Sequence, residues 1–136
     1  MTISKVGLKD FHLDLVADRL KMLDYIDISY NEFNADSLLN FLRSINRIPN
    51  EELKLRWLNL AGNTLRTSSQ RNLAQTMIEL LLKPAIVHLD LTETDLAGFV
   101  IDRISRSLRY ARTLQSLHLS TTCTEQAELI RRTIKQ

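Results

Sequence analysis

The chain has 136 residues, of which 44% are hydrophobic and 25% are charged, and its formal net charge is +2. We expect one domain over residues 1–136, because this length and composition can supply a single continuous core. The composition argues against a membrane protein or a membrane partner, since no apolar run approaches the roughly 20 residues that a spanning helix needs. A lone cysteine, Cys123, rules out an intramolecular disulfide, and we therefore expect an intracellular, cytoplasmic protein.

A spacing of apolar residues that first occurs at residues 3–13 recurs along the chain. This first copy, ISKVGLKDFHL, has apolar residues at its first, fourth, sixth and eleventh positions. Residues 23–33, LDYIDISYNEF, and residues 55–65, LRWLNLAGNTL, repeat the spacing and add an asparagine at the ninth position, Asn31 and Asn63. The first copy lacks this asparagine, so we interpret it as a degenerate repeat.

Two further copies follow, at residues 86–96 and 114–124, with threonine at the ninth position. Alternation of apolar and polar residues within each copy predicts a short strand, over 86–91 and 114–120 in these two copies. An isolated strand cannot cover its own apolar face, so the recurrence predicts several strands packed side by side.

The segments between the copies carry apolar residues at helical spacing. The residues that predict these helices are Leu38, Leu39, Leu42 and Ile45, then Leu73, Met77, Leu80 and Leu81, then Val100, Ile101, Ile104 and Leu108. Asn34 or Asp36 can cap the first of these helices. Pro49 ends the connection after it and Pro84 ends the second helix, because proline disfavours a continuing helix. A last helix is predicted from about residue 124 toward the C-terminus.

The eleven-residue pattern resembles the LxxLxLxxN signature of the leucine-rich repeat family. Its clearer copies begin at Leu23, Leu55, Ile86 and Leu114, at spacings of 32, 31 and 28 residues. Repeats of this length, which alternate a strand with a helix, resemble the ribonuclease-inhibitor-like subclass. The resemblance implies an α/β fold: a short leucine-rich repeat solenoid of about four repeats plus a partial N-terminal one, with parallel strands on the concave side and helices on the convex side.

Stacked parallel strands place every second residue on the concave surface, where we expect function to lie. The outward residues form three rows across the strands. The first row is Lys5, Tyr25, Trp57, His88 and Ser116, the second is Gly7, Asp27, Asn59, Asp90 and His118, and the third is Lys9, Ser29, Ala61, Thr92 and Ser120. Large rings beside short polar side chains are typical of binding hot spots. The candidate partner-binding residues are Tyr25, Asp27, Trp57, Asn59, His88, Asp90 and His118.

These observations favour a non-catalytic protein-protein interaction module that presents a concave aromatic and acidic strand surface to a protein partner. Other interpretations of the surface stay open: the rings can simply stabilise the sheet, and the carboxylates can simply be solvated. An alternative function is a structural subunit of a large cytoskeletal or ciliary assembly, which contacts its neighbours through the open ends and convex helices of the array. The C-terminal edge strand would then associate with another subunit.

The sequence predicts no catalytic residue, metal or cofactor. His88, Asp90 and His118 could form a facial metal site, but an open strand surface without a supporting carboxylate argues against one. Cys123 follows the last predicted strand, shortly after His118, and lacks the enclosed electropositive surroundings that a reactive thiolate needs. The chain contains no phosphate-binding glycine loop, CxxC pair or nucleophile elbow.

Arginines gather in the third predicted helix region, and basic residues recur near the C-terminus. They are Arg103, Arg106, Arg109 and Arg112, followed by Arg131, Arg132 and Lys135. Such a patch can meet nucleic acid or an acidic protein. Acidic residues interrupt it, and Tyr110 is the one interleaved aromatic that the pattern identifies, so a solvated helix face is favoured over nucleic-acid contact.

Overall fold

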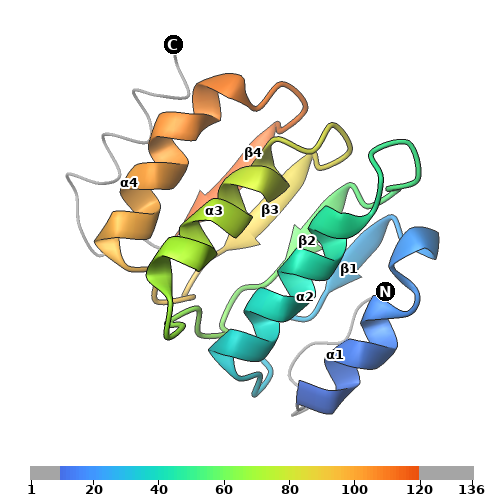
Figure 1. The fold of residues 1–136 in the computed structure, drawn as a ribbon, viewed down its shortest axis with the longest axis horizontal. Helices are drawn as coiled ribbons and strands as arrows, with labels where there is room; N and C mark the ends of the chain where they lie inside the picture. The colour runs from blue at the N-terminus through green and yellow to red at the C-terminus, as the bar shows by residue number, and fades with distance from the viewer. Residues whose placement is uncertain (1–9, 120–136) are drawn as a thin grey trace.

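The computed structural model describes residues 10–119, which form an α/β fold of two layers (Figure 1). One layer is a parallel four-stranded sheet in the order β1-β2-β3-β4. The other is a row of helices, α1 to α4 in sequence order, that covers one face of the sheet (Figure 1). The strands are β1 Tyr25–Asp27, β2 Trp57–Asn59, β3 His88–Leu91 and β4 Ser116–Leu119. The helices are α1 Asp10–Ala17, α2 Ala35–Arg47, α3 Gln70–Leu81 and α4 Gly98–Ser107, with short 3-10 helices η1 Leu20–Met22 and η2 Leu108–Tyr110.

Each strand pairs with the next strand in the sequence, and a helix lies in each connection. Parallel strands cannot be joined by a tight turn, which is why a helical segment separates successive copies of the apolar pattern. The register places Tyr25 opposite Trp57, Trp57 opposite His88, and His88 opposite Ser116. The predicted parallel strands, the helices between them and the first row are therefore confirmed within the described residues, although β3 and β4 are shorter than predicted.

The apolar positions of the pattern point toward the helices and form a continuous core. Ile26, Leu58 and Leu89, one from each of three neighbouring strands, have no exposed surface. Fully buried helix residues of the same core are Leu38, Leu42, Ile45, Leu73, Met77, Leu80, Val100 and Ile104. Full burial of each such side chain stabilises the fold by roughly 1.5–3 kcal/mol. The core thins at β4, where Leu117 and Leu119 are only partly buried.

Local signals set the helix boundaries. Of the two candidate caps for α2, Asn34 is the one that caps, because its side-chain oxygen accepts the Asp36 N–H at 2.8 Å. Asp36 links two connections instead, since its Oδ1 accepts the backbone N–H of Ser68 at 3.2 Å. α2 and α3 end shortly before Pro49 and Pro84, as the prolines predict.

Some predictions fall on other parts of the chain. The strand of the degenerate first copy, the helix from about residue 124, Cys123 and the last basic cluster lie outside the described residues. α1 was not predicted, because its 8 residues are too few to display a clear helical period. No helix among residues 10–119 combines the length and apolar character needed to cross a membrane.

Buried polar side chains occupy the ninth position of the pattern after β2 and β3, where they bind backbone groups of the turns. Asn63, which is 1% exposed, donates from Nδ2 to the Ile28 carbonyl oxygen at 2.9 Å, and its Oδ1 accepts the Asn31 N–H at 3.1 Å. Thr94 occupies the same position in the next copy, and its hydroxyl donates to the Leu91 carbonyl oxygen at 2.6 Å. The asparagine therefore ties two neighbouring copies together, whereas the threonine closes its own turn.

Replacing Asn63 by alanine should lower the free energy of unfolding by about 1–3 kcal/mol, because the Asn31 N–H loses an acceptor, whereas the Ile28 carbonyl oxygen keeps its bond from Asn31 Nδ2 at 2.9 Å. Urea denaturation followed by circular dichroism measures the change. Asn72→Ala, on the exposed surface of α3, is the matched control and should change stability by less than about 0.5 kcal/mol. A loss below about 1 kcal/mol for Asn63→Ala would mean that water replaces the amide.

Candidate functional site

The pleat of the four strands places two rows of side chains on the sheet face opposite the helices. We call this surface the strand face. Its first row is Tyr25, Trp57, His88 and Ser116, and its second row is Asp27, Asn59, Asp90 and His118. The structure thus brings all seven candidate residues from the sequence together on one face.

A ladder of four rings crosses the strand face. The ring centroids of Tyr25 and Trp57 are 5.6 Å apart. Those of Trp57 and His88 are stacked at 3.8 Å, and those of His88 and His118 are 4.9 Å apart. Trp57 is 41% exposed in this ladder, whereas His88 is only 8% exposed. His88 therefore offers little surface of its own and serves mainly as the support on which the indole stacks.

Ser116 bridges the two histidines. Its Oγ lies 2.8 Å from His88 Nδ1 and 2.9 Å from His118 Nε2. A hydroxyl has one proton, so it can donate to one ring while it accepts from the other. The bridge engages one nitrogen of each ring. Within residues 10–119, no group of three or more His, Cys, Asp or Glu side chains is placed to hold a metal ion.

The first three members of the second row have a structural role that the sequence analysis did not assign. In each of them, Oδ1 accepts the backbone N–H two residues later. The pairs are Asp27 with Ser29 at 3.0 Å, Asn59 with Ala61 at 3.0 Å and Asp90 with Thr92 at 2.9 Å. Side-chain bonds of this type close a turn, here at the carboxyl end of each strand.

Two of the described members of the third row predicted from the sequence have little exposed surface, and Lys9 and Ser120 lie outside the described residues. Ser29 and Ala61 were expected to face outward, but they are 5% and 4% exposed. These residues follow the ends of the strands, in the turns closed by Asp27 and Asn59. The Ser29 hydroxyl donates to Asp27 Oδ1 at 2.6 Å, so it bonds within the molecule and offers little surface to a partner.

Asp27 and Asp90 give the strand face a negative charge. The ion pairs between described side chains lie elsewhere, and they are Lys21 with Glu52, Arg66 with Asp95, and Arg106 with Asp102. Neither Asp27 nor Asp90 has a cation among these pairs, so both carboxylates present their charge beside the exposed indole of Trp57.

A further aromatic contact, which the sequence analysis missed, lies at the carboxyl ends of the strands. The eighth pattern position, occupied by Tyr30, Gly62 and Glu93, has a left-handed backbone in three successive copies, with φ of 55°, 74° and 56°. The Tyr30 ring lies directly over Gly62, since a Cβ added to Gly62 would overlap Tyr30 Cδ1. The Tyr30 hydroxyl donates to Glu93 Oε2 at 3.0 Å, and this bond raises the pKa of Tyr30. Alignment of the eighth positions is the sequence signal that could have identified this contact.

Comparison with known proteins identifies a shared fold. No protein-family model matches the chain, and no curated protein sequence does so either. Among solved structures, the fold is similar to the one described as Leiomodin-1 Actin-Binding Site 2 (ABS2), with a TM-score of 0.77 over 99% of this chain and 78% of that chain. The sequence identity of this pair is 10%, so the likeness shows the fold alone.

Replacing Gly62 by alanine should destabilise the protein for two separable reasons. The left-handed backbone at Gly62 costs a residue with a Cβ about 1–2 kcal/mol, and overlap with the Tyr30 ring adds to this cost. In a Tyr30→Ala background the overlap is absent, so Gly62→Ala should cost only the backbone contribution of about 1–2 kcal/mol there. Urea denaturation of the four proteins in this double-mutant cycle measures both terms. Equal costs in the two backgrounds would contradict the contact.

Stability should decrease as the pH falls, because of His88. Burial lowers the pKa of His88 below its ordinary value of 6.5, the charge of His118 lowers it further, and Asp90 opposes both effects. Native His88 therefore binds fewer protons than unfolded His88. The contribution of neutral His88 to stability is fully present above about pH 6.5. It is lost as the pH falls from there through the lower pKa of His88 in the native protein.

His88→Phe tests this dependence, because it keeps a ring against Trp57 and removes the titrating group. Urea denaturation at about pH 7.5 and pH 5.5 should show a smaller loss of stability for His88→Phe than for the wild type. His118→Gln should reduce the loss only in part, since burial continues to act on His88. An equal loss in the wild type and His88→Phe would contradict the assignment.

Proposed function

We propose that the chain is a short leucine-rich repeat solenoid of the ribonuclease-inhibitor-like subclass, with about four repeats and a partial N-terminal one. Three features support the proposal. They are the recurrent eleven-residue pattern, the parallel register between successive strands, and the bonds of Asn63 to the preceding copy.

We further propose that the strand face binds a protein partner, without catalysis and without a cofactor or metal. The observation that carries this proposal is Trp57, which is 41% exposed and is held between Tyr25 and His88. Large rings at the centre of a surface are the side chains that most often dominate binding energy. Because its neighbours already hold the indole, little side-chain entropy is lost when a partner docks.

The charges of the strand face indicate the chemistry of the partner. Asp27 and Asp90 favour a protein surface that places basic side chains beside an apolar or aromatic contact on Trp57. If the rings only stabilised the sheet, removal of Trp57 would lower stability and leave binding unchanged. Binding and stability measurements on the same variant therefore separate the two interpretations.

Actin is the first protein to test as a partner. The solved structure that shares this fold is described as an actin-binding site of leiomodin-1. A cytoskeletal role for the present chain, in the cytoplasm, is the corresponding proposal, and direct binding to purified actin tests it.

The edge of the sheet favours a second candidate function, a structural subunit of a large cytoskeletal or ciliary assembly. β4 is the last strand of the described sheet, and its Leu117 is only partly buried. Leu117 also lines a pocket of about 120 Å³ together with Leu108 and Leu114. An edge of this kind can accept another subunit. Concentration-dependent association in analytical ultracentrifugation would favour this function, and a stable monomer that binds through the strand face would favour the first.

Trp57→Ala should weaken partner binding by about 2 kcal/mol or more, which is roughly 30-fold in Kd. Purified actin is tested first, by cosedimentation. Affinity capture from native extract then compares the wild type with Tyr25→Ala/Trp57→Ala, and calorimetry measures the Kd of any partner that only the wild type retains.

Met22→Ala/Leu82→Ala is the matched control, because it removes two exposed apolar side chains that belong neither to the strand face nor to helix α4. This control should retain the partner. Thermal unfolding establishes that each variant is folded before it is used. Retention of every captured partner by Tyr25→Ala/Trp57→Ala would reject the strand face as the binding site.

A further inference from the structure

Aromatic and arginine side chains share one side of α4 and η2. They are Phe99, Arg103, Arg106 and Tyr110, at spacings of three and four residues along the helix. We call this surface the arginine stripe. The other side of α4, which includes Val100 and Ile104, is buried in the core. The stripe therefore faces away from the sheet.

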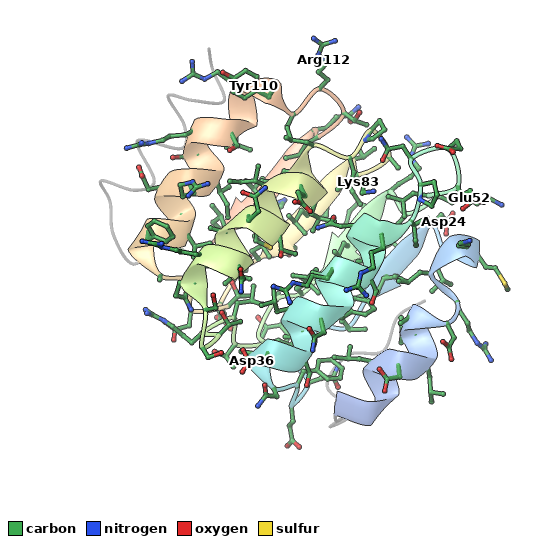
Figure 2. The ribbon with its side chains drawn as sticks, in the orientation of Figure 1. Asp24, Asp36, Glu52, Lys83, Tyr110 and Arg112 are labelled. Carbon is green, nitrogen blue, oxygen red and sulfur yellow. The ribbon has the colours of Figure 1, made fainter. Side chains whose placement is uncertain are left out.

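An arginine guanidinium group lies over each exposed ring of the arginine stripe. Phe99 is 45% exposed and Tyr110 is 64% exposed. The guanidinium carbon of Arg103 lies 5.8 Å from the Phe99 ring centre, and that of Arg109 lies 5.7 Å from the Tyr110 ring centre. Figure 2 shows Tyr110 and Arg112 projecting from the molecule beyond the end of α4.

Positive charge is in excess on this surface. Between residues 98 and 112 the chain has four arginines and one acidic residue, Asp102. Asp102 pairs with Arg106 at 3.3 Å, and an exposed pair of this kind contributes little stability. Arg103, Arg109 and Arg112 form no ion pair with the described residues. Three guanidinium groups are thus available to carboxylates from another molecule.

We infer that the arginine stripe is a second docking surface, and that its partner is an acidic protein segment that also carries apolar side chains. Guanidinium groups bind carboxylates through paired, charge-assisted hydrogen bonds. Arginine and aromatic residues are also the types most enriched at protein-protein hot spots. The inference does not depend on the strand face, which lies on the opposite side of the sheet and carries the opposite charge.

A protein segment fits this surface better than nucleic acid does. Binding of single-stranded nucleic acid uses aromatic rings whose faces are free to stack on bases. Here one face of each ring already carries an arginine, Arg103 on Phe99 and Arg109 on Tyr110. Carboxylates can reach the outer edges of these guanidinium groups without displacing the rings.

The length of the stripe sets the size of the segment. At about 1.5 Å per residue, the helical path from Phe99 to Tyr110 covers roughly 16 Å. An extended segment advances about 3.3 Å per residue, so about five residues span the stripe. A short acidic peptide is consequently a sufficient probe.

The test uses the full chain and a fluorescein-labelled octapeptide, Glu-Glu-Leu-Glu-Glu-Leu-Glu-Glu, in fluorescence anisotropy at physiological salt. We expect saturable binding that Arg103→Glu/Arg109→Glu weakens by about tenfold or more. Phe99→Ala/Tyr110→Ala should weaken it several-fold. Serine in place of both leucines of the peptide should weaken it as well, because the rings lose their apolar contact.

Arg47→Glu/Arg71→Glu is the charge-matched control, since it changes the net charge equally at exposed positions of α2 and α3. Its affinity should stay within about twofold of the wild type. Arg103→Gln/Arg109→Gln removes both positive charges without adding negative charge, and it should also weaken binding. It replaces Arg103→Glu/Arg109→Glu if thermal unfolding shows that variant to be unfolded.

Three results would overturn the inference. The first is the absence of saturable peptide binding by the wild type. The second is equal weakening of peptide binding by Arg47→Glu/Arg71→Glu, which would mean that binding depends only on the net charge of the protein. The third is tighter binding of a uridine octanucleotide than of the peptide, which would identify a nucleic-acid surface.

Discussion

The hydrogen bonds of the buried Asn63 side chain hold two successive copies of the pattern in one alignment. The amide binds the Ile28 carbonyl oxygen and the Asn31 N–H, both in the preceding copy, so the turn after β1 is tied to the turn after β2. Register determines which residues are neighbours across the strands of a sheet. The ring ladder and the second row of the strand face both depend on this alignment. Toward β4 the constraint weakens, because the Thr94 hydroxyl binds within its own copy.

The residues that stabilise the strand face are also the residues through which we propose that it binds a partner. His88 is buried, and it supports the exposed Trp57 ring from the neighbouring strand. Asp27 and Asp90 each use Oδ1 to close a turn while their charge stays at the surface. Such contacts hold the side chains of the strand face in place before any partner is bound, which would lower the entropic cost of the proposed association. Stabilisation of the sheet and binding of a partner are therefore compatible roles for these side chains.

The strand face and the arginine stripe lie on different layers of the molecule and carry opposite charges. The sheet bears the carboxylates, and α4, at the end of the helix row, bears the arginines (Figure 1). Packed side chains fill the space between the layers, so the two surfaces keep a fixed separation. The two proposed surfaces together predict that the molecule holds one partner on each layer at the same time.

The sequence by itself determined the strands, the helices between them and the rows of the strand face. These follow from apolar spacing and from local signals such as the Asn34 cap and Pro84, which act over a few residues. Only the tertiary structure decided how the side chains meet: His88 is buried, and Tyr30 lies over Gly62 and reaches toward Glu93. Such contacts join residues about thirty or sixty positions apart, and they depend on rotamers and turn geometry. A periodic pattern specifies which face a residue occupies, but not what its side chain touches there.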